Sequence, residues 1–154
     1  RIAGERRQVQ VAVRAGDGRA TDPFVGGWAA KDLAIAMLGE AGFTEVHGDR
    51  KVVTGVEPSL SAIDRRGRRW WFEVVGGRTS NRPGAQRVEL LWRSIAKAAV
   101  AHSTDPSVRF GVLTVGLPTT TNGGRALDAV VGPRRPVAMV VDLLADDAVA
   151  ALRH

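Results

Sequence analysis

The sequence predicts an α/β domain in which a mixed central sheet is flanked by helices. Three features lead to this class: an early helical stretch, three strand-like runs after it, and a long amphipathic helix that precedes a buried strand. The strand-like runs are short and bounded by turn signals, and the long helix carries apolar residues at helical spacing. This alternation along one chain is typical of a sheet that carries helices on both faces.

The N-terminal part is expected to hold a strand, a linker and a helix. Residues 7–14 alternate apolar and polar side chains, as a half-exposed strand does, and a turn-rich stretch follows them. We therefore assign residues 1–20 to an N-terminal strand and linker. A helix is expected from Gly27 through "WAAKDLAIAMLGEAGF", with Gly42 as its C-terminal cap.

Three strands are expected next. The first is short and covers residues 51–56, while "SLSAID" and "RWWFEVV" form a hairpin around the turn "RRGR". If Asp64 pairs with Arg69 across this turn, antiparallel register places Glu73 opposite Leu60. Both faces of "RWWFEVV" are apolar, which predicts a central strand that is buried on both sides.

The second half is expected to read helix, strand, helix, strand, helix. After a loop at residues 76–83, a helix over 84–101 carries an apolar stripe at helical spacing, made of Val88, Leu91, Trp92, Ile95 and Ala99. A buried strand over 107–117 follows. The remaining elements are a helix at 125–131, a strand at 136–144 and a final helix at 145–154.

Composition limits the classes of function. The chain has 154 residues, which suits one domain with its own core, and we expect residues 1–154 to be a single domain of a longer protein. There are no cysteines, which excludes disulfides and thiolate metal sites. No run approaches about 18 apolar residues, so the sequence predicts no membrane span. These features fit a cytoplasmic protein.

The positive charge is concentrated in one segment. The net charge is +6, and eight arginines lie between Arg65 and Arg93 with only Glu73 and Glu89 as acids, so this segment alone carries +6. A localised basic segment favours a polyanion, most often nucleic acid, as the partner. The candidate DNA contacts are Arg65, Arg66, Arg68, Arg78, Ser80, Asn81, Arg82, Arg87 and Arg93. The turn arginines fit a solubilising turn equally well.

Glu73 lies in the middle of the most apolar strand. A buried carboxylate costs free energy unless it is paired or coordinates a metal. Two interpretations follow: a metal-binding acid, or a structural ion pair with an arginine such as Arg87 or Arg93.

The segment "EPSLSAIDRRGRRWWFEVV" resembles the PD-(D/E)xK, or restriction-endonuclease-like, nuclease superfamily, and the resemblance runs from the Gly27 helix to the 107–117 strand. It implies the order α-β-β-β-α-β, here with a C-terminal α-β-α tail. In that family Pro-Asp begins the second strand and Glu-x-Lys lies on the third. The acids bind Mg²⁺, and the lysine orients or activates the attacking water. Pro58 matches the proline and Glu73 the acid of Glu-x-Lys.

The resemblance implies DNA as the partner, Mg²⁺ as the cofactor and metal-dependent phosphodiester cleavage in a restriction or defence system. Two positions depart from the pattern, because Ser59 stands where the family has Asp and Val75 where it has Lys. In the predicted register Asp64 lies roughly 13 Å along the strands from Glu73, too far to share a metal ion. We therefore assign Asp64 to the turn.

The second carboxylate has several candidate sources. Glu57, just before the strand, is the first choice, so the expected metal ligands are Glu73 and Glu57. Asp32 or Glu40 of the first helix could serve instead. The hydroxyls of Ser59 and Ser61 could hold a metal-bound water but bring no charge.

The missing lysine also has a substitute. Of the three lysines, Lys97 shares a face of the long helix with Gln86 and Arg93, and in this superfamily the lysine can migrate to that helix. The expected catalytic residues are therefore Glu73, Lys97 and Gln86, with Gln86 placing a water or a phosphate. Arg78 could stabilise charge but cannot act as a base. The alternative for Lys97 is a surface lysine with no role in a site.

The two departures leave a second function open: a catalytically inactive relative that binds DNA or supports assembly. A homodimer, or a fusion to a helicase or methyltransferase module, is compatible with either function.

Overall fold

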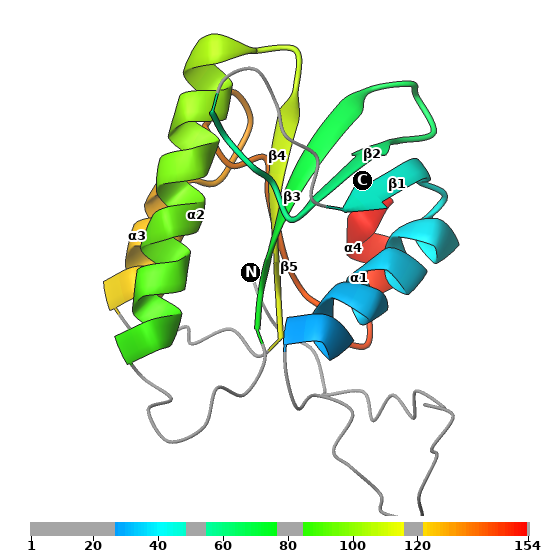
Figure 1. The fold of residues 1–154 in the computed structure, drawn as a ribbon, viewed down its shortest axis with the longest axis horizontal. Helices are drawn as coiled ribbons and strands as arrows, with labels where there is room; N and C mark the ends of the chain where they lie inside the picture. The colour runs from blue at the N-terminus through cyan, green and yellow to red at the C-terminus, as the bar shows by residue number, and fades with distance from the viewer. Residues whose placement is uncertain (1–26, 49–54, 77–84, 116–121, 154) are drawn as a thin grey trace, which may run out of the picture.

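The computed structural model describes residues 27–48, 55–76, 85–115 and 122–153. Within them a five-stranded mixed sheet, in the order β1-β2-β3-β4-β5, is flanked by helices (Figure 1), as the sequence predicts. The strands are β1 (Thr44–Gly48), β2 (Leu60–Ile63), β3 (Arg69–Val75), β4 (Arg109–Thr114) and β5 (Met139–Asp142). The helices are α1 (Gly27–Ala41), α2 (Ala85–Thr104), α3 (Asn122–Val130) and α4 (Ala148–Leu152).

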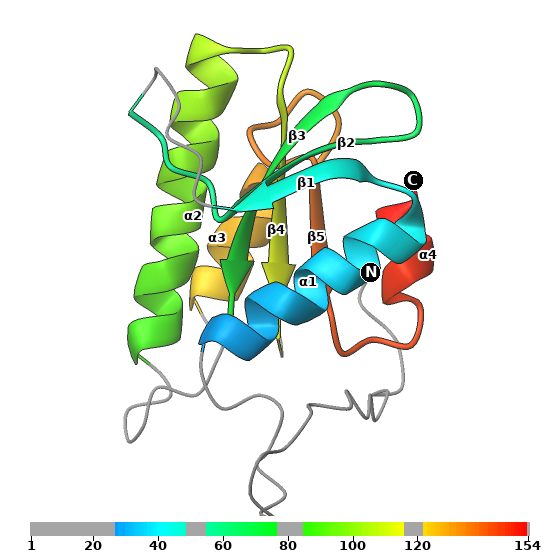
Figure 2. The same cartoon turned by 45° about the vertical axis from the view of Figure 1, so that its right-hand side comes forward.

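The sheet divides into an antiparallel and a parallel half. β1, β2 and β3 pair antiparallel, and β3, β4 and β5 pair parallel. Parallel neighbours need a crossover connection, and α2 and α3 supply the two crossovers. Both lie on one face of the sheet, while α1 and α4 lie on the other (Figures 1 and 2). The order of elements agrees with the α-β-β-β-α-β order and the α-β-α tail that were expected.

β3 is the central strand and separates two hydrophobic clusters. Trp70 and Phe72 belong to the cluster beneath α1 and α4, whereas Trp71 and Val75 belong to the cluster beneath α2. This alternation follows from the period of two along a strand, and it confirms that β3 is buried on both sides. Glu73 shares the α2 side and is only 8% exposed.

Stacked rings fill the cluster beneath α1. Trp70 and Phe72 stack with their centroids 5.4 Å apart, and Phe43 meets Phe72 edge-on at 5.5 Å. Gly111 of β4 pairs with Phe72, and a Cβ at this glycine would lie 2.6 Å from the phenyl ring. The rings therefore require a residue without a side chain at this position of β4.

Two features of the strands differ from the expectation. Among the described residues the first strand of the sheet is β1, which was not expected, and of the strand expected at 51–56 Val56 is buried outside any strand while residues 51–54 lie outside the described residues. The hairpin register is also shifted by one residue, because Leu60 pairs with Phe72, so Ser59 rather than Leu60 comes opposite Glu73. The turn is tighter than expected: Asp64 pairs with Arg68, whose carbonyl accepts the Asp64 N–H at 3.0 Å.

The apolar stripe of α2 is centred differently from the prediction. Leu91 and Ala98 are buried, but Trp92 is 52% exposed and Ala99 is exposed as well. The buried face also includes Ser94, whose hydroxyl donates to the Leu90 carbonyl at 2.8 Å and so needs no other partner. Because the buried face of α2 has a polar residue at its centre, the spacing of apolar residues alone does not identify this face.

The predicted strand and linker at residues 1–20 lie outside the described residues. In the described part of the chain, no helix has the length and apolar character needed to cross a membrane.

Candidate functional site

Glu73 and Lys97 form an ion pair on the face of β3 that α2 covers. The Lys97 Nζ lies 2.8 Å from the Glu73 Oε1, with the Glu73 side chain 11% and the Lys97 side chain 25% exposed. Leu91 and Ala98 set the rotation of α2 by packing against the sheet, and this rotation directs Lys97 towards β3. The partner of Glu73 is therefore a lysine from the long helix, whereas Arg93, one turn away, is exposed.

Ser59 holds the other oxygen of the same carboxylate. Its backbone N–H donates to the Glu73 Oε2 at 3.3 Å, and its hydroxyl oxygen accepts the Val74 N–H at 3.1 Å. Ser59, which stands where the family has Asp, therefore contacts Glu73 directly, but through a neutral backbone N–H. It does not supply the second carboxylate that the family's Asp would provide.

Glu57 contacts Lys97 through its backbone carbonyl rather than its side chain. The Glu57 carbonyl accepts a hydrogen bond from the Lys97 Nζ at 2.8 Å, while the Glu57 residue is exposed. Lys97 thus joins the segment before β2 to β3. Nothing in the sequence marks this contact, because every residue carries the same carbonyl.

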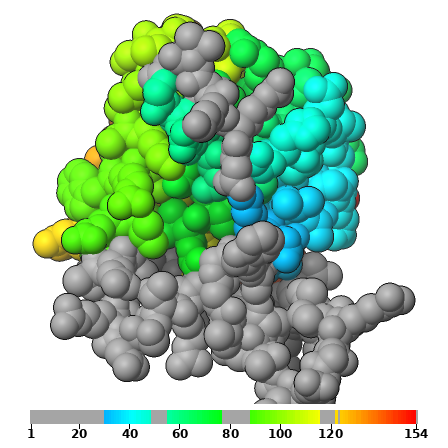
Figure 3. All heavy atoms as spheres, viewed as in Figure 1, coloured from blue at the N-terminus to red at the C-terminus, as the bar shows by residue number. Residues whose placement is uncertain are grey.

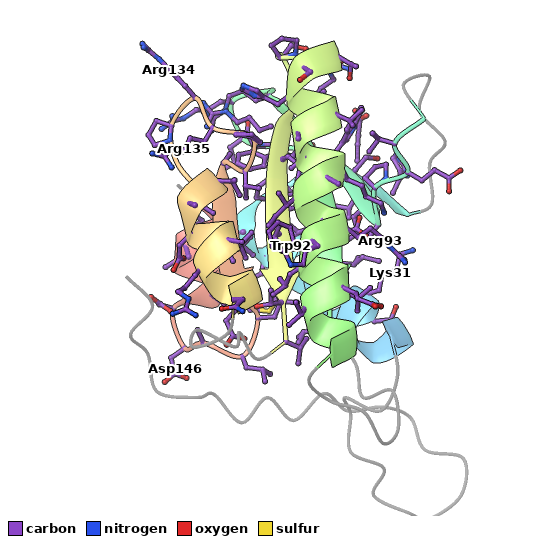
Figure 4. The ribbon with its side chains drawn as sticks, turned by 90° about the vertical axis from the view of Figure 1, so that its left-hand side faces the viewer. Lys31, Trp92, Arg93, Arg134, Arg135 and Asp146 are labelled. Carbon is purple, nitrogen blue, oxygen red and sulfur yellow. The ribbon has the colours of Figure 1, made fainter. Side chains whose placement is uncertain are left out.

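A second lysine approaches the same segment from α1. A Cβ at Gly48 would lie 3.0 Å from the Lys31 Nζ and 3.8 Å from the Ser59 carbonyl oxygen, so this ammonium lies beside the start of β2. Lys31 and Arg93 project to the same side of the molecule, one from each helix (Figure 4). On this side α2 and α1 flank a strip of surface from the hairpin (Figure 3). Lys31 and Arg93 therefore bring two further basic side chains to the side of the molecule on which Lys97 and Glu73 pair.

The donor atoms fit Mg²⁺ only in part. Among the described residues, no three or more His, Cys, Asp or Glu side chains are grouped so that they could hold a metal ion. The Glu73 carboxylate, the Ser59 hydroxyl and the Glu57 carbonyl are oxygen donors, and Mg²⁺ is often held by one or two carboxylates together with waters and substrate phosphates. Asp32 and Glu40 are both exposed on α1. The donor types suit Mg²⁺, provided that Lys97 gives up the Glu73 Oε1.

Asp64 belongs to the hairpin turn. Its carboxylate accepts the Trp70 Nε1–H at 2.9 Å, the Arg68 Nε–H at 2.6 Å and the backbone N–H groups of Arg66 and Arg68. Burial raises the pKa of Asp64, but the hydrogen bonds from Trp70, Arg68 and Arg66 outweigh this effect and lower the pKa from 3.8 to about 2. Asp64 therefore closes the turn and ties it to the aromatic cluster.

The turn arginines do not lie next to Glu73. Arg69 starts β3 four residues before Glu73, roughly 13 Å away at about 3.3 Å per residue. Arg68 pairs with Asp64, and the Arg65 guanidinium lies over Gly42, where a Cβ would meet its Nε.

The remaining candidate contacts divide into two sets. Arg93 is exposed on the helix that carries Lys97, one turn away, and Arg66 is exposed at the turn. Gln86 and Arg87 belong to the first turn of α2, but their side chains lie outside the described residues. The expected loop contacts also lie outside them: Arg78, Ser80, Asn81 and Arg82.

Comparison with known proteins gives a remote likeness only. No family model and no curated protein sequence matches the chain. A solved repair endonuclease from Pyrococcus abyssi is similar with a TM-score of 0.39 and 16% identity, over 73% of this chain and 44% of that one. The EndoMS–dsDNA2 complex is similar with a TM-score of 0.43 and 19% identity, over 75% of this chain and 46% of that one. The chain spans less than half the length of either structure, and at these TM-scores the likeness carries no weight for its function.

Proposed function

We propose that this chain is a DNA-engaging, restriction-endonuclease-like domain that cleaves phosphodiester bonds with Mg²⁺. The contact between the Lys97 Nζ and the Glu73 Oε1 carries this proposal. It joins an acid on a buried strand to a lysine on the helix that follows, which are the two charges that Glu-x-Lys places on one strand. The net charge of +6 between Arg65 and Arg93 supports DNA as the substrate.

Each residue of the site has a role in this proposal. Glu73 would hold Mg²⁺, with Glu57 and Ser59 as further oxygen donors. When bound, Mg²⁺ supplies Lewis-acid polarisation of a phosphate oxygen and activation of a water. Lys97 stabilises the negative charge that develops on the phosphate, and Gln86 places a water or a phosphate. Arg93, beside Lys97 on α2, attracts the DNA backbone.

A second function is favoured by one specific observation. In the described ranges Glu73 belongs to no group of three or more His, Cys, Asp or Glu side chains that could hold a metal ion. A catalytically inactive domain that binds DNA, or that supports assembly of a larger protein, needs no such group. The basic segment would then serve binding alone, and the Glu73–Lys97 pair would hold α2 against β3.

Plasmid cleavage separates the two functions. The domain is incubated with supercoiled plasmid and Mg²⁺ or Mn²⁺, in parallel with Glu73→Gln. Glu89→Gln serves as the matched control, since it removes the same charge from an exposed position of α2. Cleavage that is lost only in Glu73→Gln supports the nuclease. Salt-sensitive binding without cleavage, unchanged in Glu73→Gln, supports the binding module, and no DNA binding at low salt excludes both.

A cytoplasmic location and a role in restriction or defence belong to the same proposal. Their cheapest test is the sequence next to this domain, because a helicase or methyltransferase module in the same chain would assign the domain to a restriction system.

A further inference from the structure

We propose that the Lys97 ammonium occupies the cation position of this site, so that a divalent metal reaches Glu73 only when Lys97 moves away. This inference deepens the proposed function and rests on it. Lys97 Nζ lies 2.8 Å from the Glu73 Oε1 and 2.8 Å from the Glu57 carbonyl oxygen. One cation thus joins an oxygen of β3 to an oxygen of the segment before β2, and the second oxygen of Glu73 already accepts the Ser59 N–H.

The donor set explains why an ammonium suits this position. A single carboxylate and a backbone carbonyl carry one negative charge between them, which one positive charge balances. A dication at the same oxygens would face the Lys97 ammonium within a few ångströms, where like charges repel strongly in a partly buried site. Metal binding therefore competes with Lys97 for the Glu73 Oε1.

Lys97 has the freedom to leave. Its side chain is 25% exposed, and a lysine carries its charge on a flexible four-carbon stem that can redirect the ammonium towards solvent or a phosphate. The Glu73 side chain is less exposed, at 11%, and Ser59 holds it in place. The carboxylate is thus the fixed part of the site and the lysine its movable part.

Lys31 offers a control for the loss of a different lysine near the same segment. A Cβ at Gly48 would lie 3.0 Å from the Lys31 Nζ and 3.8 Å from the Ser59 carbonyl oxygen. Replacement of either lysine by methionine removes one positive charge from this neighbourhood and keeps a long side chain. Only the Lys97 replacement removes the hydrogen bond to Glu73.

The test is a calorimetric titration of the protein with Mn²⁺, without DNA, at neutral pH. We expect Lys97→Met to bind Mn²⁺ about tenfold more tightly than the wild type, or more so. The double variant Glu73→Gln/Lys97→Met should lose this gain. Lys31→Met should tighten binding by no more than about threefold, the size expected from a screened charge.

Three outcomes would overturn the inference. Lys97→Met could bind Mn²⁺ no more tightly than the wild type, or Lys31→Met could gain as much Mn²⁺ affinity as Lys97→Met. The double variant Glu73→Gln/Lys97→Met could also keep the higher Mn²⁺ affinity. If Lys97→Met is unfolded without metal, circular dichroism with millimolar Mn²⁺ replaces the titration. If Mn²⁺ restores the fold of Lys97→Met, the inference is supported. If Lys97→Met stays unfolded in Mn²⁺ while the double variant folds, the inference is overturned. Because no DNA is present, the result is independent of whether the domain binds or cleaves DNA.

Discussion

Lys97 on α2 and Glu73 on β3 lie 24 residues apart in sequence, and the ammonium of one is 2.8 Å from the carboxylate of the other. Val75, where the family pattern has a lysine, is 6% exposed and packs beneath α2 with Leu91. Position 75 of β3 therefore belongs to the hydrophobic core, and Lys97 of the covering helix α2 supplies the positive charge. The same packing that buries Val75 also brings α2 close enough for Lys97 to reach Glu73.

Lys97→Met should destabilise the fold. Removal of the lysine leaves a carboxylate that is 8% exposed without its charged partner, which we expect to cost about 2–4 kcal/mol. Chemical denaturation at neutral pH, in the absence of divalent metal, measures the difference. The double variant Glu73→Gln/Lys97→Met should recover most of the loss, because no unpaired charge remains. Equal stability of wild type and Lys97→Met would show that the pair contributes nothing.

In the β2–β3 hairpin, the sequence predicts which side chains share a face but not the register of the two strands. The faces of β3 were predicted correctly, because the alternation of side chains is a property of the extended backbone. The register was wrong by one residue, because the length of the turn depends on how Asp64 accepts the N–H groups of Arg66 and Arg68. Counting residues across a turn does not include such side-chain hydrogen bonds.

The site shows a different limit. Spacing alone assigns Lys97 to the polar face of the long helix, opposite the apolar stripe, and only the family resemblance singles it out as a substitute lysine. The structure brings this residue to Glu73. Glu57 was expected to act through its carboxylate, but its carbonyl makes the contact with Lys97. Ser59 likewise contacts the carboxylate through its backbone N–H. Backbone donors and acceptors are common to almost all residues, so their contacts become predictable only when the register is known.

Asp64→Asn should reduce stability in a pH-dependent way. The pKa of Asp64 is lowered from 3.8 to about 2 in the folded state, so its ionised form stabilises the fold at any pH above about 4. We expect wild type to exceed Asp64→Asn by about 1–2 kcal/mol between about pH 5 and 7 after allowance for solvent screening. This advantage should shrink as the pH falls from about 4 through about 2 and vanish only below about pH 2, as measured by urea denaturation across this range.

Asp105→Asn is the matched control. A hydrogen bond from Ser107 and the contact with Arg69 also lower the pKa of Asp105, but its side chain is 29% exposed compared with 9% for Asp64. Solvent screens the more exposed carboxylate, so its substitution should have the smaller effect. A larger loss in Asp105→Asn would contradict the assignment of Asp64 as the main acid of the hairpin.

Gly111→Ala should destabilise the sheet, and Gly39→Ala should stabilise α1. The new Cβ at Gly111 would lie 2.6 Å from the Phe72 ring, and overpacking of this kind typically costs about 1–3 kcal/mol. Gly39 lies within α1, and a Cβ there meets nothing within 4 Å. Alanine at this position should add about 0.5–1 kcal/mol through its higher helix propensity. Thermal unfolding of the two variants should therefore shift the midpoint in opposite directions.

Arg93→Ala should weaken DNA binding and reduce its dependence on salt. Arg93 is exposed on α2, one turn from Lys97, on the side of the molecule to which Lys31 also projects. Loss of one phosphate contact should lower the slope of log affinity against log salt by about one, as measured by fluorescence anisotropy at several salt concentrations. Arg153→Ala removes the same charge just after α4, on the opposite face of the sheet, where its guanidinium donates to the Glu40 carbonyl. Affinity and slope should stay unchanged in that variant, and equal effects in both would place the DNA elsewhere than along the Lys97 face of α2.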